Sequence, residues 1–173
     1  MESNIRILIS EKDIKQRVKE LAEQISEDYR GRSVHIICIL KGSIFFACDL
    51  MKKIDIPVTI DFMAVSSYGD DTISSGRVRI VKDLDESISG KDVIIVEDII
   101  DSGNTLSYLS ELLGARGPAS LNVCSLLDKP ERRVTDVDVK YVGFEIPDEF
   151  VIGYGLDYKQ RYRNLPYVGV LEL

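Results

Sequence analysis

Two adjacent carboxylates, followed by small and hydroxyl-bearing residues, form the part of this sequence best suited to chemistry. Glu97 and Asp98 come directly after the apolar run 93–96, and residues 101–105 read Asp-Ser-Gly-Asn-Thr. Neighbouring carboxylates repel each other unless a cation or a hydroxyl-rich ligand lies between them, and a divalent metal or a sugar diol meets that need. A helix that begins after Gly103 would also offer its first backbone N–H groups to a phosphate. The segment therefore suits a phosphorylated sugar that carries magnesium.

A purely structural role is the alternative for the same residues. In that interpretation Ser102 caps the helix, Gly103 only turns the chain, and the two acids are solvated. Loops of this composition are common. The spacing alone therefore leaves both interpretations open.

Other nucleotide-binding and hydrolytic motifs do not compete with this segment. The pair Gly-Lys at 90–91 lacks the upstream glycine of a P-loop, and Gly153-x-Gly155 lacks the third glycine of a dinucleotide fingerprint. His35 is the only histidine, which excludes a zinc site built from several histidines, and the sequence contains no G-x-S-x-G. We expect His35 to be a strand residue near an end of the sheet.

The elements that must position these residues alternate between buried strands and amphipathic helices. Helical spacing of apolar residues predicts helices from Ser10 to Gly31 and over residues 43–53 and 104–115. Apolar runs predict strands over residues 34–40, 58–66, 77–84, 92–97, 121–127, 139–144, 150–154 and 167–171, and residues 67–76 form a polar loop. Glu97 and Asp98 then lie at the carboxyl end of a strand, where open α/β sheets bind ligands. We predict an α/β fold with a central, mostly parallel sheet flanked by helices and capped at its edge by the C-terminal third.

The composition favours a single globular domain without a nucleic-acid or membrane partner. The chain has 173 residues, of which 22 are Lys or Arg and 29 are Asp or Glu, and 45% are hydrophobic. A net charge of −7 argues against the basic surface that DNA- and RNA-binding proteins usually carry. No apolar run approaches the roughly 20 residues of a membrane span, and the first residues do not resemble a signal peptide. Because Cys38, Cys48 and Cys124 lie in apolar runs, we expect them to be buried and reduced, as in the cytoplasm.

Several segments, in order along nearly the whole chain, match the motifs of one known family. They are residues 40–43 (Leu-Lys-Gly-Ser), 66–69 (Ser-Ser-Tyr-Gly), 97–105, 126–129 (Leu-Leu-Asp-Lys), 147–158 and 161–167. On these residues the chain resembles the type I phosphoribosyltransferases, and among them the bacterial hypoxanthine(-guanine) branch. The resemblance implies one domain over residues 1–173, with a core at about 30–145, a small hood built from the N-terminal and C-terminal segments, and a mobile loop at the active site.

The resemblance also implies a reaction in which phosphoribosyl pyrophosphate gives its 5-phosphoribosyl group to hypoxanthine or guanine, with pyrophosphate as the second product. Glu97 and Asp98 would face the ribose hydroxyls and a magnesium ion. Asp101 would be the catalytic residue, because its carboxylate would accept the proton of the purine N7 and favour positive charge on the ribose. The phosphate- and ribose-binding segment would consist of Glu97, Asp98, Ile99, Ile100, Asp101, Ser102, Gly103, Asn104 and Thr105.

The resemblance assigns the pyrophosphate and the mobile loop to other segments. Lys41, Gly42 and Arg163 would bind pyrophosphate, with a cis peptide bond between the residues Leu40 and Lys41. The forked cation of Arg163 suits an anionic leaving group. The loop that closes over the site and excludes water would include Ser67 and Tyr68.

The purine would be held by Lys129, Phe150, Val151 and Asp157. Lys129 would donate to the purine O6, which favours 6-oxopurines over adenine, whose exocyclic amine cannot accept that bond. Phe150 would stack on the base, and the backbone of Val151 would contact its edge. Asp157 would also hold a second magnesium, so that the metal ligands would be Glu97, Asp98 and Asp157. The relatives further imply a homo-oligomer, either a dimer or a tetramer.

Other functions and plainer roles remain open at this point. A regulator that binds the phosphoribosyl ligand and an RNA or DNA, without turnover, would use the same phosphate loop. A transferase for uracil, orotate or adenine would differ at the residues that contact the base. In structural terms, Asp101 would be a helix cap, Lys129 a surface lysine and Phe150 a core residue.

Overall fold

A six-stranded sheet forms the centre of the protein. The structure, a computed structural model, describes residues 4–67 and 78–172. The strands follow the order β4-β3-β2-β5-β6-β7, and only β4 runs antiparallel to its neighbour. Their bounds are β2 (Val34–Leu40), β3 (Val58–Ser67), β4 (Val78–Lys82), β5 (Asp92–Ile100), β6 (Ser120–Asp128) and β7 (Tyr141–Glu145). The predicted mostly parallel sheet is confirmed.

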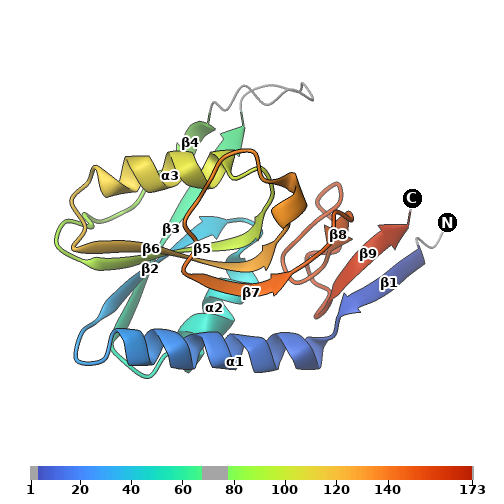
Figure 1. Cartoon of the computed structure of the whole chain (residues 1–173), viewed down its shortest axis with the longest axis horizontal. Coiled ribbons are helices and arrows are strands. Elements are labelled where there is room, and N and C mark those ends of the chain that lie inside the picture. Colours follow the sequence, from blue (N-terminus) through green and yellow to red (C-terminus); the bar gives the residue numbers. More distant parts are fainter. Residues whose placement is uncertain (1–3, 68–77, 173) are drawn as a thin grey trace.

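Helices cover both faces of this sheet (Figure 1). The helices α1 (Glu11–Asp28) and α2 (Ile44–Lys53) lie on one face, and α3 (Asn104–Gly114) lies on the other. Within β2, Ile36 and Cys38 pack in the cluster with α1 and α2, whereas Ile37 and Ile39 pack in the cluster with α3. Because β2 and β5 are buried on both faces, their sequences read as continuous apolar runs. In the described residues no helix is both long and apolar enough to cross a membrane.

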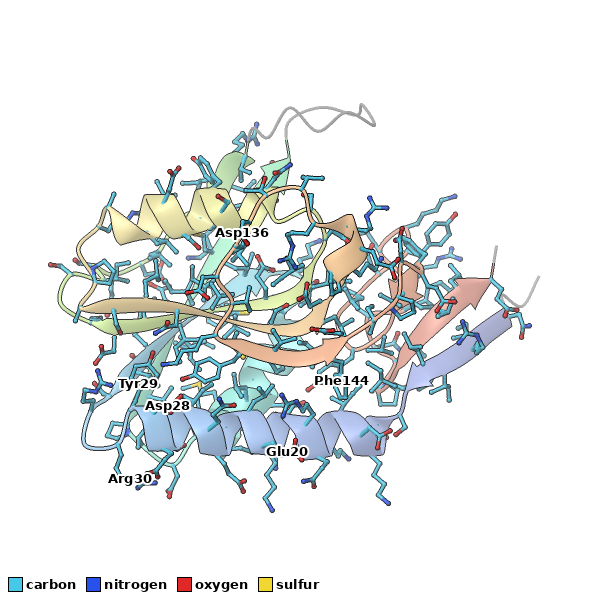
Figure 2. All side chains as sticks on the ribbon, viewed as in Figure 1. Glu20, Asp28, Tyr29, Arg30, Asp136 and Phe144 are labelled. Atoms are coloured by element: carbon cyan, nitrogen blue, oxygen red, sulfur yellow. The ribbon has the colours of Figure 1, made fainter. Side chains whose placement is uncertain are left out.

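The predicted start and inner face of the first helix are confirmed. The hydroxyl of Ser10 accepts a hydrogen bond from the backbone N–H of Asp13 at 3.1 Å, which caps α1. Figure 2 shows Glu20 and Arg30 pointing away from the sheet, whereas the ring of Tyr29 lies toward it and is buried. His35 is buried in β2, as expected, and its Nδ1 lies 2.7 Å from the hydroxyl of Thr59.

A second, three-stranded antiparallel sheet joins the two ends of the chain. It has the order β1-β9-β8 and lies beside α1 and the main sheet, where both termini meet (Figure 1). Its strands are β1 (Asn4–Ile9), β8 (Val151–Ile152) and β9 (Val168–Glu172). The sequence analysis assigned no strand to β1, because the partner that makes it a strand lies at the opposite end of the chain. The strand expected over residues 150–154 is only two residues long, because the backbone turns at Gly153 with φ 94°.

Two further expectations need correction. Cys48 is exposed on α2, while Cys38 and Cys124 are buried as expected. The central strand does not end at Glu97 but continues to Ile100. It continues because β6 also extends and pairs with it as far as Ile100, whereas β2 is paired with β5 only as far as Val96. Glu97 and Asp98 therefore lie within β5, in the part that pairs with β6 on one side and has no strand partner in β2 on the other.

Candidate active site

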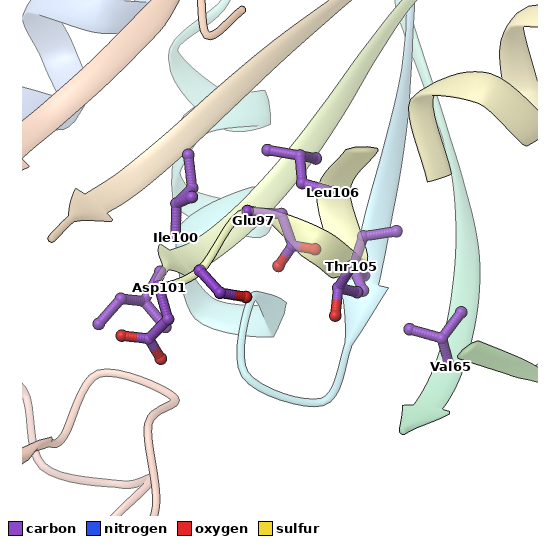
Figure 3. Close-up of a pocket in the computed structure, with 10 residues that line it drawn as sticks. Val65, Glu97, Ile100, Asp101, Thr105 and Leu106 are labelled. Atoms are coloured by element: carbon purple, nitrogen blue, oxygen red, sulfur yellow. The ribbon is translucent and has the colours of Figure 1, made fainter. Parts of the chain in front are cut away.

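A cavity of about 230 Å³ opens where β5 extends beyond β2. In Figure 3 the side chain of Glu97 lies between Asp101 on one side and Thr105 on the other. The cavity is lined by Ile39, Val65, Glu97, Ile99, Ile100, Asp101, Ser102, Gly103, Thr105 and Leu106. Glu97 and most of the segment expected to bind phosphate and ribose are therefore brought together in one pocket.

The loop between β5 and α3 lines this cavity and is held by the segment after β6. In this loop the backbone carbonyl of Ser102 accepts hydrogen bonds from the N–H groups of Val134 and Thr135, at 2.9 and 3.0 Å. Ser102 is not the helix cap: the cap is Gly103 with φ 87°, and the Ser102 hydroxyl accepts from the N–H of Asn104 at 3.3 Å. Because the first N–H groups of a helix have no partner inside it, this end of α3 suits an anion.

The acids Glu97 and Asp98 are neighbouring carboxyl groups on β5, and each affects the ionisation of the other. Burial raises the pKa of Glu97 well above its usual range, and the charge of Asp98 raises it further. Asp98 keeps some exposed surface, but protein atoms surround it closely, and this burial raises its pKa from 3.8 to about 6. Two acids held in this way repel when both are ionised, and a cation would relieve that repulsion.

The two acids point to different sides of β5, as alternation along a strand requires. Glu97 lines the cavity, whereas Asp98 packs against Gly42 in the loop after β2. A methyl group added at Gly42 would come within 1.7 Å of Asp98 Oδ2, and one added at Gly155 would come within 2.0 Å of the Gly42 carbonyl oxygen. The expected cis peptide bond between Leu40 and Lys41 is present. The glycine of the expected pyrophosphate loop thus lies directly against one of the acids.

Asp101 lies in a group of four charged side chains rather than at a helix cap. Its Oδ1 lies 3.7 Å from Lys129 Nζ and 3.9 Å from Arg132 Nε. Asp148 Oδ1 lies 3.8 Å from Lys129 Nζ and 3.6 Å from Arg132 Nη1. Lys129 is only 7% exposed, so it is not an ordinary surface lysine. We call Asp101, Lys129, Arg132 and Asp148 the charge ring.

Two cations expected at the pyrophosphate site share one partner. Gln160 Oε1 accepts from Lys41 Nζ at 3.3 Å and from Arg163 Nη2 at 3.2 Å. Arg163 also pairs with Asp157 at 3.1 Å and donates to the carbonyl of Gly155 at 2.6 Å. The segment after β8 therefore holds Arg163 beside Lys41, although the two are far apart in the sequence.

The remaining expected residues are distributed around these groups. Phe150 is 48% exposed and meets Tyr158 edge-on, with ring centroids 5.7 Å apart, so it is not a core residue. Val151 is buried in β8. Ser67 is the last residue of β3, whereas Tyr68 and most of the expected mobile loop lie outside the described residues.

The structure does not gather the three expected metal ligands into one group. Asp157 pairs with Arg163, Glu97 lines the cavity, and Asp98 lies against Gly42. Over residues 4–67 and 78–172, no cluster of three or more acidic, histidine or cysteine side chains is arranged to hold a metal ion.

Three polar residues of this region were missed by the sequence analysis. Arg132 and Asp148 complete the charge ring, and Gln160 joins the two cations. Arg132 ends a three-residue 3-10 helix (Pro130–Arg132), and the other two lie in irregular segments. In such short or irregular segments neither periodicity nor spacing indicates which side chain faces the pocket. Only Asp148 carried a signal, because it belongs to the matched segment 147–158.

Comparison with known proteins agrees with this geometry. Residues 8–159 match the family model described as "Phosphoribosyl transferase domain". A hypoxanthine phosphoribosyltransferase of Salmonella typhimurium is 54% identical over 100% of this chain and 98% of its own, and a hypoxanthine-guanine phosphoribosyltransferase of Bacillus subtilis is 53% identical over 96% and 93%. The crystal structure of a hypoxanthine phosphoribosyltransferase from Staphylococcus aureus superposes with a TM-score of 0.94 at 53% identity, covering 96% of this chain and 91% of its own. The chain therefore belongs to the phosphoribosyltransferase family, within the branch of the hypoxanthine and hypoxanthine-guanine enzymes.

Proposed function

We propose that this chain is a purine salvage enzyme that transfers the 5-phosphoribosyl group of phosphoribosyl pyrophosphate to hypoxanthine or guanine. The products are the purine nucleoside monophosphate and pyrophosphate. One observation carries this proposal: Asp101 lines the same cavity as Glu97, Ser102, Gly103 and Thr105, and it lies 3.7 Å from the buried ammonium of Lys129. A sugar phosphate and a 6-oxopurine thus find their complementary groups side by side.

The phosphorylated sugar occupies the cavity at the start of α3. Its 5′-phosphate accepts hydrogen bonds from the backbone N–H groups of the 102–105 loop, and the partial positive charge of the helix end favours the anion. Glu97 and Asp98 face the ribose hydroxyls. Lys41 and Arg163, joined through Gln160, bind the pyrophosphate group.

Magnesium fits the carboxyl pair. Glu97 and Asp98 are adjacent and surrounded by protein, and burial raises the pKa of both carboxyl groups. A nearby cation would favour their ionised forms. Two carboxylates are sufficient because magnesium is usually held by one or two carboxylates together with substrate oxygens and water. When bound with the substrate, the ion supplies positive charge that stabilises the departing pyrophosphate.

In the transfer step the purine N9 forms a bond to the ribose C1 while the bond from C1 to pyrophosphate breaks. Lys129 donates to O6 and orients the base. Asp101 accepts the proton that leaves N7, and its negative charge stabilises positive charge on the ribose. Phe150 covers the face of the base, and the backbone of Val151 contacts its edge.

The direct test is product formation. The protein is incubated with hypoxanthine, phosphoribosyl pyrophosphate and magnesium, and the mixture is analysed for inosine monophosphate by chromatography. We expect product with hypoxanthine or guanine and none when magnesium is chelated. If hypoxanthine, guanine and xanthine all fail to react, the proposed function is wrong.

Replacing Lys129 with methionine should raise KM for hypoxanthine by about tenfold to a hundredfold, because a hydrogen bond from a charged donor to O6 is lost. KM for phosphoribosyl pyrophosphate should stay near its original value. Steady-state kinetics in both substrates measure the two effects. Lys19→Met, on the exposed face of α1, is the matched control. An unchanged KM for hypoxanthine would remove Lys129 from base recognition.

Replacing Gly42 with alanine should raise KM for phosphoribosyl pyrophosphate by about tenfold, since the added methyl group would lie 1.7 Å from Asp98 Oδ2 and must displace that acid or the loop. Gly114→Ala is the control, because its added methyl group would meet only Leu121, at an ordinary 3.9 Å. Initial rates at varied substrate concentration distinguish the two variants. Equal KM values for both variants would mean that the contact between Gly42 and Asp98 does not matter for substrate binding.

The compartment and the assembly of the enzyme are part of the same proposal. The buried, unpaired thiols of Cys38 and Cys124 suit the reducing cytoplasm. The relatives lead us to expect a homo-oligomer, a dimer or a tetramer, which sedimentation velocity would detect.

A further inference from the structure

Asp148 is a carboxylate of the charge ring that the proposed reaction does not yet use. Its Oδ1 lies 3.8 Å from Lys129 Nζ, almost the same distance as that from Asp101 Oδ1 to the same nitrogen, 3.7 Å. The Lys129 side chain is 9% exposed, while those of Asp101 and Asp148 are 50% and 45% exposed. One nearly buried ammonium therefore lies between two carboxylates of similar exposure.

This arrangement matters because the proposed reaction changes the charge of only one of the two carboxylates. When Asp101 accepts the N7 proton it becomes neutral, and it no longer balances the charge of Lys129. A buried ammonium without a counter-ion is strongly unfavourable, so the proton transfer would be opposed if Asp101 were the sole partner. Asp148 takes no part in the proton transfer and keeps one carboxylate beside Lys129.

Arg132 is the fourth member of the charge ring, but it does not balance the charge of Lys129. It lies 3.6 Å from Asp148 and 3.9 Å from Asp101, so it can lie beside whichever carboxylate is ionised. Its side chain is 53% exposed, and solvent can screen its charge. Lys129 has no such access to solvent and depends on the two carboxylates.

We propose that Asp148 is a positioning residue that balances and holds the Lys129 ammonium while Asp101 carries the purine proton. The inference rests on the proposed function for its place in the reaction, but the pairing of Asp148 with Lys129 is independent of turnover. Asp148 acts through Lys129 and needs no contact with the base.

The first test is kinetic. Asp148→Asn should lower kcat with hypoxanthine by about tenfold and leave KM for phosphoribosyl pyrophosphate nearly unchanged. Asp148→Glu, which keeps the charge, should recover most of the lost rate. Glu149→Gln is the matched control, since this neighbouring carboxylate pairs with Arg6 at 2.7 Å and not with the ring. An active wild-type enzyme whose Asp148→Asn variant keeps its full kcat would overturn the inference.

The second test does not need turnover. Tm is measured for Asp101→Asn, Asp148→Asn and the double variant. The double variant should lose about 3 °C more than the two single losses together, because only then does Lys129 lack any carboxylate. Adding Lys129→Met should restore that extra loss. Additive losses would overturn the inference even if the enzyme is active, whereas the extra loss in a protein without transferase activity would refute the proposed function and leave the pairing supported.

Discussion

Replacing Asp101 with asparagine should lower kcat for the formation of inosine monophosphate by about 10²–10⁴-fold, the range that a general base contributes. Asparagine has nearly the same shape, so the 102–105 loop keeps its geometry, but the amide cannot accept the N7 proton. The KM for phosphoribosyl pyrophosphate should change much less, because the groups proposed to bind it, the backbone of residues 102–105 and Arg163, are unchanged. Steady-state kinetics with purified variants measure both quantities.

The control for this experiment is Asp136→Asn, which removes an exposed carboxylate from the segment that packs on the phosphate loop (Figure 2). It should retain its kcat, since Asp136 does not line the cavity. Turnover of Asp101→Asn within a factor of a few of the wild type would show that another group accepts the proton.

Replacing Asp98 with asparagine should stabilise the metal-free protein at neutral pH while reducing its activity. The pKa of Asp98 is raised from 3.8 to about 6 by burial, so ionisation is harder in the folded chain than in the unfolded chain. Below pH 3.8 the carboxyl group is protonated in both states. As the pH rises to about 6, the unfolded chain releases this proton first, and stability is lost across that window. Asparagine never ionises and avoids the loss.

The expected gain is on the order of 3 kcal/mol at pH 7, which corresponds to a rise in Tm of about 6–12 °C for a chain of this length. At pH 4 the gain should nearly vanish. Thermal unfolding is followed by circular dichroism at both pH values, in buffer with a chelator, for the wild type, Asp98→Asn and Asp136→Asn. A gain of equal size at both pH values would show that it does not come from ionisation of the buried acid.

Much of the fold was accessible from the sequence because its central strands are buried on both faces. The runs 34–40 in β2 and 93–96 in β5 contain one polar residue, His35, and that pattern distinguishes a covered parallel sheet from other strands. The face of α1 that packs on the sheet follows from its helical spacing, and its start follows from Ser10. In each case the signal is local.

The elements that escaped prediction depend on distant partners. β1 is a strand because β9 lies beside it, and β5 extends to Ile100 because β6 continues with it. The same holds for the site: the type and order of Glu97 to Thr105 indicated a sugar phosphate, and the matched segments indicated Lys129. Arg132 and Gln160 gave no signal, since only the folded chain brings them to Asp101 and Lys41.

The pairing of β1 with β9 links the beginning of the chain to the pocket proposed for the purine. In the described part of the chain, β8 begins immediately after Phe150 and pairs with β9, whose other edge pairs with β1. Removing residues 4–9 would leave β9 with a bare edge and would loosen the strand beside Phe150, the ring proposed to stack on the base. The opening residues, far in sequence from the matched motifs, therefore stabilise that side of the proposed site.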